Sequence, residues 1–423
     1  MDRRQMLEKL ASHTDIFDFI IIGGGATGIG ILLEAVTRGY TAVLLEASDF
    51  TKSTSGKSTK LIHGGVRYLA QGNIGLVREA SIERGILRNI APHIVRDQSF
   101  IIPVFTVFDS LLYTIGLKFY DMLAGRFRLG RSVRIGRKSV ISSLPNLCKK
   151  GLRAGVLYHD GQFDDSRLAL ACLQTAAGYD GIALNYMPVT GFQKDEKGKL
   201  CGVITRDELS GKIHKIGAKT IVNATGVFAD QILGMDEPGH RKTIRPSQGI
   251  HIVIGKEFLP GKHALMIPKT EDGRVLFAVP WLDRVVVGTT DTPVEDIRLE
   301  PVALEEEIDF ILRTSAKYLN KAPRREDILS IFAGLRPLAD TGNSEKTKEI
   351  SRSHKISVSD SGLFTIIGGK WTTFRKMAED LVNRVESLHK LQRTHSITRK
   401  LKLSGYKKDI DTDEALYLYG SEV

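Results

Sequence analysis

Cysteine is scarce in this chain: Cys148, Cys172 and Cys201 are the 3 among 423 residues, and they stand far apart. They form no CxxC pair and no even-numbered framework, so neither a disulfide-stabilised scaffold nor a cysteine-ligated metal site is expected. Long apolar runs are also missing, because no stretch approaches the ~20 residues that span a bilayer. The N-terminal segment MDRRQMLEKLASHTD has no apolar core and no small-residue cleavage site, which argues against a secretory signal. We therefore expect a protein that folds in a reducing compartment and holds no metal.

Negative charge is comparatively scarce too. The chain has 60 Lys and Arg against 49 Asp and Glu, a formal net charge of +11. This excess suits an anionic partner such as a phosphorylated substrate, acidic lipid or nucleic acid, but it also fits a generally basic soluble enzyme. An apolar segment at 111–117 leads into a basic run: Lys118, Arg126, Arg128, Arg131, Arg134, Arg137 and Lys138. Such a segment can lie in a membrane interface, although a core helix followed by a solvated loop would have the same pattern.

Glycine, in contrast, is abundant, and one cluster indicates the fold. Residues 18–46 read DFIIIGGGATGIGILLEAVTRGYTAVLLE, which predicts a strand, a glycine-rich turn, a helix and a second strand that ends in Glu46. Gly23 permits the tight turn, Gly25 lets a pyrophosphate approach bare backbone, and Gly28 lets the helix pack against the strand. Glu46 can accept hydrogen bonds from ribose hydroxyls. The segment therefore predicts a dinucleotide site, for FAD or for NAD, and the carboxylate argues against a 2′-phosphate.

The remaining chain alternates between two patterns. Hydrophobic periodicity and turn residues predict helices at 74–91, 301–320 and 372–388, and strands at 219–223, 265–268, 275–280, 285–289 and 363–367. The three strands between 265 and 289 read as an antiparallel meander. We expect a nucleotide-binding domain assembled from non-contiguous pieces, interrupted by an antiparallel-sheet domain, with the substrate between the two.

Three glycine-containing motifs distinguish between the two dinucleotides. They are the first turn, the strand end Asn-Ala-Thr-Gly at 223–226, and Gly368-Gly369 before the last helix. This pattern resembles the glutathione-reductase-type class of FAD proteins, in which separate segments wrap one flavin. The resemblance implies an α/β fold with a discontinuous FAD-binding Rossmann domain (15–100, 151–240 and 330–400). An antiparallel-β substrate or cap domain (101–150 and 241–329) and a residual tail (401–423) complete the predicted organisation.

Within that class, the chain resembles the FAD-dependent glycerol-3-phosphate dehydrogenases over residues 18 to about 385. The match is carried by STKLIHGGVRYL at 58–69, APH at 91–93, VNATG at 222–226, GIHIV at 249–253, VPW at 279–281, GTTD at 288–291, GLRPL at 334–338 and GGKWTTFRK at 368–376. The chain departs from the family at Thr27, where members usually carry Asn, and at Val227-Phe228, where they carry Pro-Trp. It also lacks almost all of the family's C-terminal helical domain.

The resemblance implies oxidation of sn-glycerol 3-phosphate to dihydroxyacetone phosphate, with hydride transfer from C2 to the flavin and electrons passed to a quinone. A dianionic phosphate requires guanidinium or ammonium ligands, and a C2 hydroxyl requires a proton acceptor near neutral pH. The predicted substrate ligands are Arg67, Tyr68, Arg336, Arg352 and Lys370. His251, Arg336 and Lys370 are the predicted catalytic residues, with His251 as the base.

The predicted flavin contacts include a competing histidine, His63, which we assign to a structural or flavin-side role. The complete set is Gly23, Gly25, Gly28, Glu46, Ser53, Ser55, Lys60, Leu61, His63, Gly226, Gly369 and Lys370, with residues 53–60 facing the pyrophosphate and the flavin ring. We also expect peripheral binding to an anionic membrane surface on the cytoplasmic face of the cell membrane, a possible homodimer, and no nucleic acid partner.

Three alternatives remain open at this stage. The same site could belong to an oxidase that transfers electrons to O₂. A basic RNA-binding flavoprotein would also open with a glycine-rich FAD motif, but it would leave Arg336, Arg352 and Lys370 unexplained. A flavin-binding remnant without turnover is the third alternative, suggested by the missing C-terminal domain.

Overall fold

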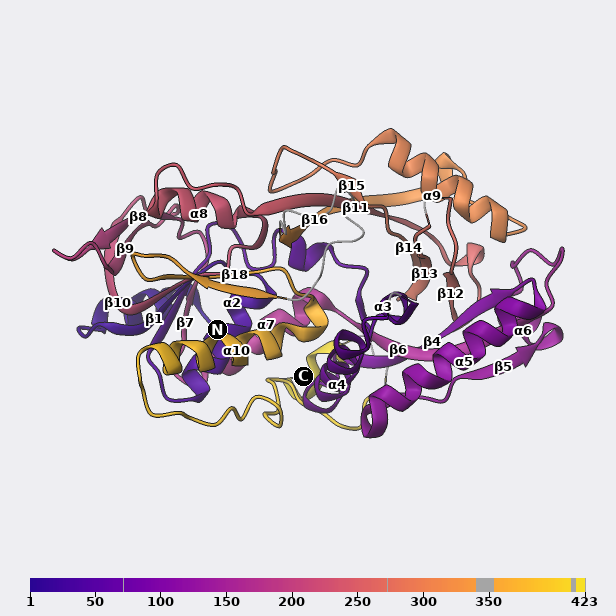
Figure 1. Ribbon diagram of the computed structural model, residues 1–423, viewed down its shortest axis with the longest axis horizontal. Coiled ribbons are helices and arrows are strands. Elements are labelled where there is room, and N and C mark those ends of the chain that lie inside the picture. The colour runs from indigo at the N-terminus through magenta and orange to yellow at the C-terminus, as the bar shows by residue number, and fades with distance from the viewer. Residues whose placement is uncertain (71, 272, 340–353, 412–415, 423) are drawn as a thin grey trace.

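Two β-sheets, one at each end of an elongated molecule, organise the chain (Figure 1). The computed structural model describes residues 1–70, 72–271, 273–339, 354–411 and 416–422. The first sheet has eight strands and the second has ten. The predicted combination of an α/β nucleotide-binding unit with a largely antiparallel unit is confirmed.

The eight-stranded sheet is parallel at its centre, where β1 (Phe17–Ile22) lies between β2 (Ala42–Leu45) and β10 (Ile213–Asn223). Its main order is β17-β18-β10-β1-β2-β7, extended by the antiparallel strands β9 and β8. Strands far apart in sequence are thus neighbours, as expected for a domain built from separate segments. The other bounds are β7 (Ile182–Leu184), β8 (Val189–Lys194), β9 (Leu200–Arg206), β17 (Lys355–Val358) and β18 (Leu363–Ile367).

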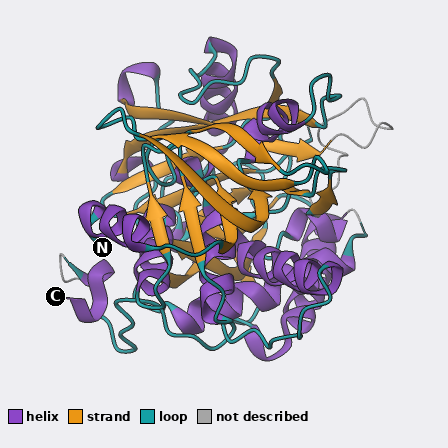
Figure 2. Ribbon diagram, turned by 90° about the vertical axis from the view of Figure 1, so that its left-hand side faces the viewer, coloured by secondary structure: helices purple, strands orange, loops and turns teal. Residues whose placement is uncertain are grey.

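Helices cover both faces of this sheet, which explains why its central strands are almost wholly apolar (Figure 2). One face packs against α2 (Ala26–Thr37), α7 (Asp165–Ala177) and α10 (Phe374–Leu388). The opposite face packs against α1 (Arg3–Ser12) and α8 (Ala229–Asp236). The last helix begins at Phe374, after a 3-10 turn at Trp371–Thr373, slightly later than its sequence predicts.

The ten-stranded sheet contains the predicted meander. Strands β12 (Ala264–Ile267), β13 (Leu276–Trp281) and β14 (Arg284–Gly288) pair in antiparallel fashion. The order is β15-β11-β14-β13-β12-β4-β6-β3, with β16 on β11 and β5 on β6. The remaining strands are β3 (Leu61–Ile62), β4 (Val95–Val104), β5 (Val133–Gly136), β6 (Ala154–Phe163), β11 (Ile244–Gly255), β15 (Thr292–Pro293) and β16 (Ile328–Ala339). Its helices are α3 (Val66–Ala70), α5 (Val107–Ala124), α6 (Arg137–Ser143) and α9 (Glu305–Tyr318). Helix α4 (Ile74–Ile90) reaches into the core of the first unit through Ile86, Leu87 and Ile90.

The sheets divide the chain differently from the predicted domain ranges. Strand β3 and the first part of β4 fall within 15–100, and β6 falls within 151–240, yet all three strands pair in the ten-stranded sheet. Most of β16 falls within 330–400 and also pairs there. The predicted ranges and the two sheets thus differ at these strands, because alternation within a strand shows which face is buried but not which sheet it joins. The chain therefore passes between the two sheets more often than the predicted domain ranges imply.

Candidate functional site

The glycine turn after β1 is a backbone cradle that no larger residue could form. Gly23 has φ +109°, and a Cβ added there would lie 2.8 Å from the carbonyl oxygen of Ala224. A Cβ on Gly28 would lie 1.9 Å from the carbonyl oxygen of Gly23. The first contact joins the turn to the Asn-Ala-Thr-Gly strand end, and the second brings α2 against the turn. Two of the three predicted motifs, the first glycine turn and the strand end at 223–226, are therefore in direct contact.

Glu46 supports this turn from the end of β2. Its carboxylate accepts hydrogen bonds from the backbone N–H of Gly24 (2.6 Å) and of Ser48 (2.8 Å), while burial raises its pKa. The hydroxyl of Ser55 accepts the N–H of Ala26 (2.9 Å) at the N-terminus of α2. A turn without side chains, a helix N-terminus and an acid at the end of the next strand are the groups that a dinucleotide requires. The residues present fit FAD.

The loop after Ser53, predicted to face the flavin, contacts both the ten-stranded sheet and the segment after β18. The Thr54 hydroxyl donates to the carbonyl of Leu335 on β16 (2.6 Å), and the Trp371 indole donates to the carbonyl of Ser55 (2.9 Å). The loop is thus tied both to the antiparallel sheet and to the Gly368-Gly369 motif. Gly226, also predicted, begins the 3-10 turn that follows β10.

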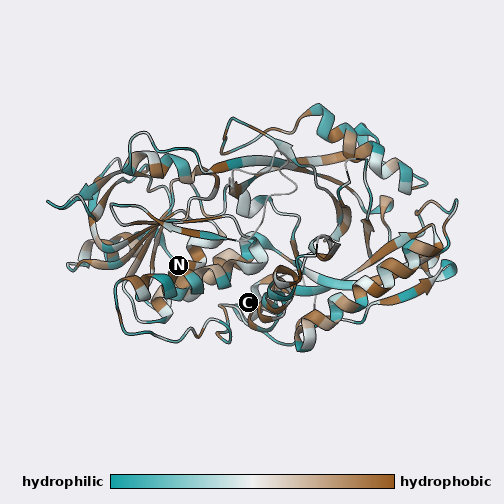
Figure 3. Ribbon diagram, in the orientation of Figure 1, coloured by the Kyte–Doolittle hydropathy of each residue, from teal (hydrophilic) through white to brown (hydrophobic). Residues whose placement is uncertain are grey.

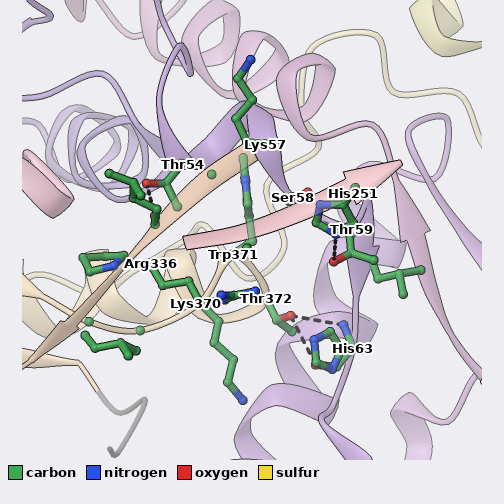
Figure 4. A pocket seen from close by; sticks show the side chains of 18 of the residues that line it. Thr54, Lys57, Ser58, Thr59, His63, His251, Arg336, Lys370, Trp371 and Thr372 are labelled. Carbon is green, nitrogen blue, oxygen red and sulfur yellow. Dashed lines mark hydrogen bonds between the residues drawn. The ribbon is translucent and has the colours of Figure 1, made fainter. Parts of the chain in front are cut away.

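Two adjoining cavities lie beside the ten-stranded sheet, with volumes of about 200 and about 150 Å³, and the first also borders the segment that follows β18 of the eight-stranded sheet. The residues that line both are Thr59, His63, Phe277 and Arg336. The first, which Figure 4 shows, is bordered by the predicted flavin residues Leu61, Gly369 and Lys370. The second extends to Tyr68 and Asp291. The sequence-predicted residues from opposite ends of the chain therefore meet at one place.

Arg336 has a fixed orientation at the junction of the two cavities. From β16, its Nη2 donates to the Thr289 hydroxyl (3.0 Å) and the Thr290 carbonyl (2.9 Å), and its Nη1 lies 3.4 Å from Asp291 Oδ1. The side chain is 19% exposed, so this cation is largely desolvated but still borders the cavities. Its Nη1 also donates to the Gln248 carbonyl (3.2 Å), so the terminal N–H groups hold the guanidinium in place while its positive charge faces the cavities, where it would attract an oxyanion.

His251 lies deeper, on β11. Its Nε2 is 2.8 Å from the Thr59 hydroxyl, and its ring stacks on Phe332 with centroids 4.8 Å apart. Burial, and secondarily the positive charges of Arg336 and Lys60, lower the pKa of His251 to about 3. The imidazole is therefore neutral at physiological pH and has a lone pair with which it can accept a proton.

The Gly368-Gly369 motif places its residues against the KLIHGG motif. The Thr372 hydroxyl donates to the carbonyl of His63 (3.3 Å) and accepts the backbone N–H of His63 (3.2 Å). Lys370 Nζ lies 3.8 Å from the centroid of the Tyr68 ring, a cation–π geometry that holds the ammonium beside the second cavity. These contacts join two predicted segments more than three hundred residues apart.

Three predicted residues require a different account. Lys60 donates to Asp165 (2.6 Å) and to the carbonyl of Gly56 (3.0 Å), so it acts on the site mainly through its charge. Arg67 belongs to α3, but its side chain lies outside the described part of the structure, and Arg352 lies outside the described residues altogether. Their assignment as substrate ligands stays a prediction.

Sequence reasoning missed Thr59 and Asp291 as individual residues. Both stand inside quoted motifs, STKLIHGG and GTTD, so the signal was present. Their roles depend on partners 192 and 45 positions away, His251 and Arg336, which no local pattern specifies.

A glycine-rich dinucleotide turn joined to a cationic, partly apolar cavity is the arrangement of a flavin-dependent oxidoreductase. Residues 18–374 match the family described as FAD dependent oxidoreductase, and the chain belongs to this family. The predicted cofactor, FAD, is thereby confirmed.

Within the family, the chain is similar to glycerol-3-phosphate dehydrogenases. It is 41% identical over 420 residues to the mitochondrial enzyme of Rattus norvegicus, covering 96% of this chain and 57% of the relative. For the mitochondrial enzyme of Saccharomyces cerevisiae the identity is 38% over 448 residues, covering 96% and 69%. The solved glycerol-3-phosphate dehydrogenase from Bacillus halodurans, complexed with FAD, has a TM-score of 0.77 and 31% identity over 95% of this chain and 70% of that one.

The family resemblance found from the motifs is therefore confirmed. The chain spans 57 to 60% of the length of the first curated relatives that it matches.

Proposed function

We propose that this protein oxidises sn-glycerol 3-phosphate to dihydroxyacetone phosphate with FAD and passes the electrons to a quinone. The observation that carries the proposal is the fixed guanidinium of Arg336 at the junction of two cavities, one of which is bordered by flavin-binding segments. A phosphate ester held there would place its carbinol close to those segments. The names of the relatives support the same substrate.

Each residue has a distinct task in this proposal. Bound FAD supplies the acceptor for the C2 hydrogen and its electron pair. Arg336 orients the phosphate, and Lys370 adds a second positive charge. His251 accepts the hydroxyl proton, and it is a weak base while the cavity holds no anion. A dianion beside Arg336 would offset the positive charges that lower the pKa of His251, so substrate binding itself strengthens the base.

Anaerobic titration of the FAD-loaded protein tests this proposal. Glycerol 3-phosphate should bleach the flavin absorbance, whereas glycerol, which has the same carbinol without the phosphate, should not at the same concentration. Equal bleaching by both, or by neither, would contradict the proposal. Reoxidation then identifies the acceptor: a quinone analogue should restore the colour quickly, while stoichiometric peroxide formation with O₂ would favour the oxidase. The quinone and a homodimeric assembly stay predictions.

We propose, second, that α5 and the basic run after it bind an anionic membrane surface. The residues of α5 that are at least half exposed include Val107, Phe108, Leu111, Leu112, Ile115 and Met122 (Figure 3). Lys118 and the six basic residues between 126 and 138 are exposed as well. An apolar helix face beside a cluster of cations matches the boundary between acyl chains and acidic headgroups. Among the described residues, no helix is both long and apolar enough to cross a membrane.

Sedimentation with vesicles tests the second proposal. Vesicles that contain phosphatidylglycerol should bind the protein, and neutral vesicles should bind it less. Replacing both Leu111 and Leu112 with Ser should weaken binding by ~10-fold or more, because two exposed apolar side chains lose their burial. Leu209→Ser is the matched control, because Leu209 is 65% exposed in the other unit. Binding should fall with salt, and salt-insensitive binding or an equal effect of the control would end the idea.

A further inference from the structure

Among the described residues, Thr59 is the only one with a hydroxyl group that lines both cavities. It stands two residues before the start of β3, lines both cavities, and has its Oγ1 atom 2.8 Å from His251 Nε2. His251 itself lines the first cavity and not the second. Figure 4 shows the hydrogen bond between Thr59 and His251 at the wall of the first cavity, so Thr59 stands between His251 Nε2 and a carbinol at the junction of the two cavities, beside Arg336.

The imidazole is held so that it cannot turn toward the second cavity. Phe332 stacks on its ring with an interplanar angle of 16°, and His251 is 3% exposed. A Cβ added to Gly288 on the neighbouring strand β14 would clash with His251 Cδ2, so the ring packs directly against the backbone of that strand. His251 Nδ1 is buried and has no hydrogen-bond partner among the described residues. Nε2 is therefore the ring nitrogen that can exchange a proton with the cavities, and its hydrogen-bond partner is Thr59.

We propose that Thr59 is a catalytic residue that relays the substrate's hydroxyl proton to His251. This inference rests on the proposed function. As the C2 hydrogen leaves with its electron pair, the substrate O–H bond breaks and its proton forms a new O–H bond at Thr59 Oγ1. The original hydroxyl proton of Thr59 passes to His251 Nε2, forming an N–H bond. The net change is one proton moved from the carbinol oxygen to the imidazole, and Thr59 ends as it began.

The charges around this pair are arranged to make the relay depend on substrate. The charged groups that line the cavities or act on His251 are the cations Lys57, Lys60, Arg274, Arg336 and Lys370 and the carboxylates Asp160 and Asp291. The cations outnumber the carboxylates, which opposes an imidazolium until the phosphate dianion arrives. Proton transfer to His251 is then favoured only when the substrate is in place.

The test compares Thr59→Val, which keeps the shape and removes the hydroxyl, with Thr59→Ser, which keeps the hydroxyl. In anaerobic stopped-flow, the valine variant should reduce its flavin ~100-fold more slowly, the usual scale of lost acid–base catalysis, with little change in substrate affinity. The serine variant should keep most of the rate. In the valine variant the rate should also rise with pH, because the proton must leave to solvent. A purely structural threonine would lower the rate equally at every pH.

A second readout does not depend on turnover. The relay requires the tautomer with the proton on Nδ1, so ¹⁵N NMR of the FAD-loaded protein should show His251 Nε2 as a hydrogen-bond acceptor, and its signal should shift in Thr59→Val. A protonated Nε2, or equal rates in wild type and Thr59→Val, would overturn the relay alone. Failure of the wild-type protein to bleach with glycerol 3-phosphate would instead overturn the proposed function.

Discussion

Two regions of this molecule differ in the groups that form them: the glycine turn that fits FAD, called the nucleotide-binding end, and the cavities beside Arg336 and His251 proposed for the substrate, called the substrate end. At the first, the contacts come from bare backbone: Gly23 and Gly28 leave no room for a side chain, and α2 begins directly at the turn. At the second, they come from side chains such as Arg336 and His251, which are held by partners from other strands. The first end is therefore specified by shape, and the second by charge and hydrogen bonding.

This difference predicts how each end responds to change. A backbone cradle fails when any atom is added, because the added atom meets main chain that cannot move. A cationic cavity tolerates changes in volume, but it fails when a directed donor is lost. The two kinds of failure should be separable, since one removes FAD and the other removes substrate affinity.

The largest effect is expected for Gly28→Ala at the nucleotide-binding end. The added methyl group would stand 1.9 Å from the carbonyl oxygen of Gly23, so α2 must move away from the turn, at a cost of ~3 kcal/mol or more. We expect protein that is purified without flavin or does not fold. Gly75→Ala is the matched control, because its Cβ meets nothing within 4 Å in α4. It should stabilise the protein by ~0.5–1 kcal/mol. Normal FAD content in Gly28→Ala would refute the backbone account.

A smaller and different effect is expected for Arg336→Lys at the substrate end. Lysine keeps the charge but cannot replace the donors that reach Thr289 and Thr290 while facing a phosphate. The KM for glycerol 3-phosphate should rise ~100-fold, which corresponds to one or two lost charge-assisted hydrogen bonds. FAD content should stay normal. Arg324→Lys, at a site whose side chain is 80% exposed, is the control, and an equal KM change there would contradict the assignment.

The same contrast explains what the sequence could predict. The turn from Gly23 to Gly28 and the acid Glu46 are local, so spacing alone reveals strand, turn, helix and ligand type. Arg336 and Lys370 were found only through family motifs, because no spacing brings β16 beside the segment after β18. The sheet to which β4 and β6 belong, and the pairing of Thr59 with His251, depend on contacts across the whole fold. Long-range pairing of this kind leaves no period in the sequence.

The smallest expected effect concerns protons rather than ligands, and it tests whether the buried imidazole of His251 is kept neutral in the folded protein. Because the pKa of His251 falls from 6.5 to about 3 on folding, only the unfolded chain binds a proton there between these values. Stability should therefore decrease as pH falls through this window, by at most ~1.4 kcal/mol per pH unit from this residue. Above pH 6.5 the residue adds no slope, since it is neutral in both states. Denaturation of FAD-loaded wild type and His251→Asn between pH 7 and pH 5 measures the contribution, because the other groups are common to both. The asparagine variant should lose less stability on acidification, and parallel slopes would mean that the imidazole is not held neutral by its surroundings.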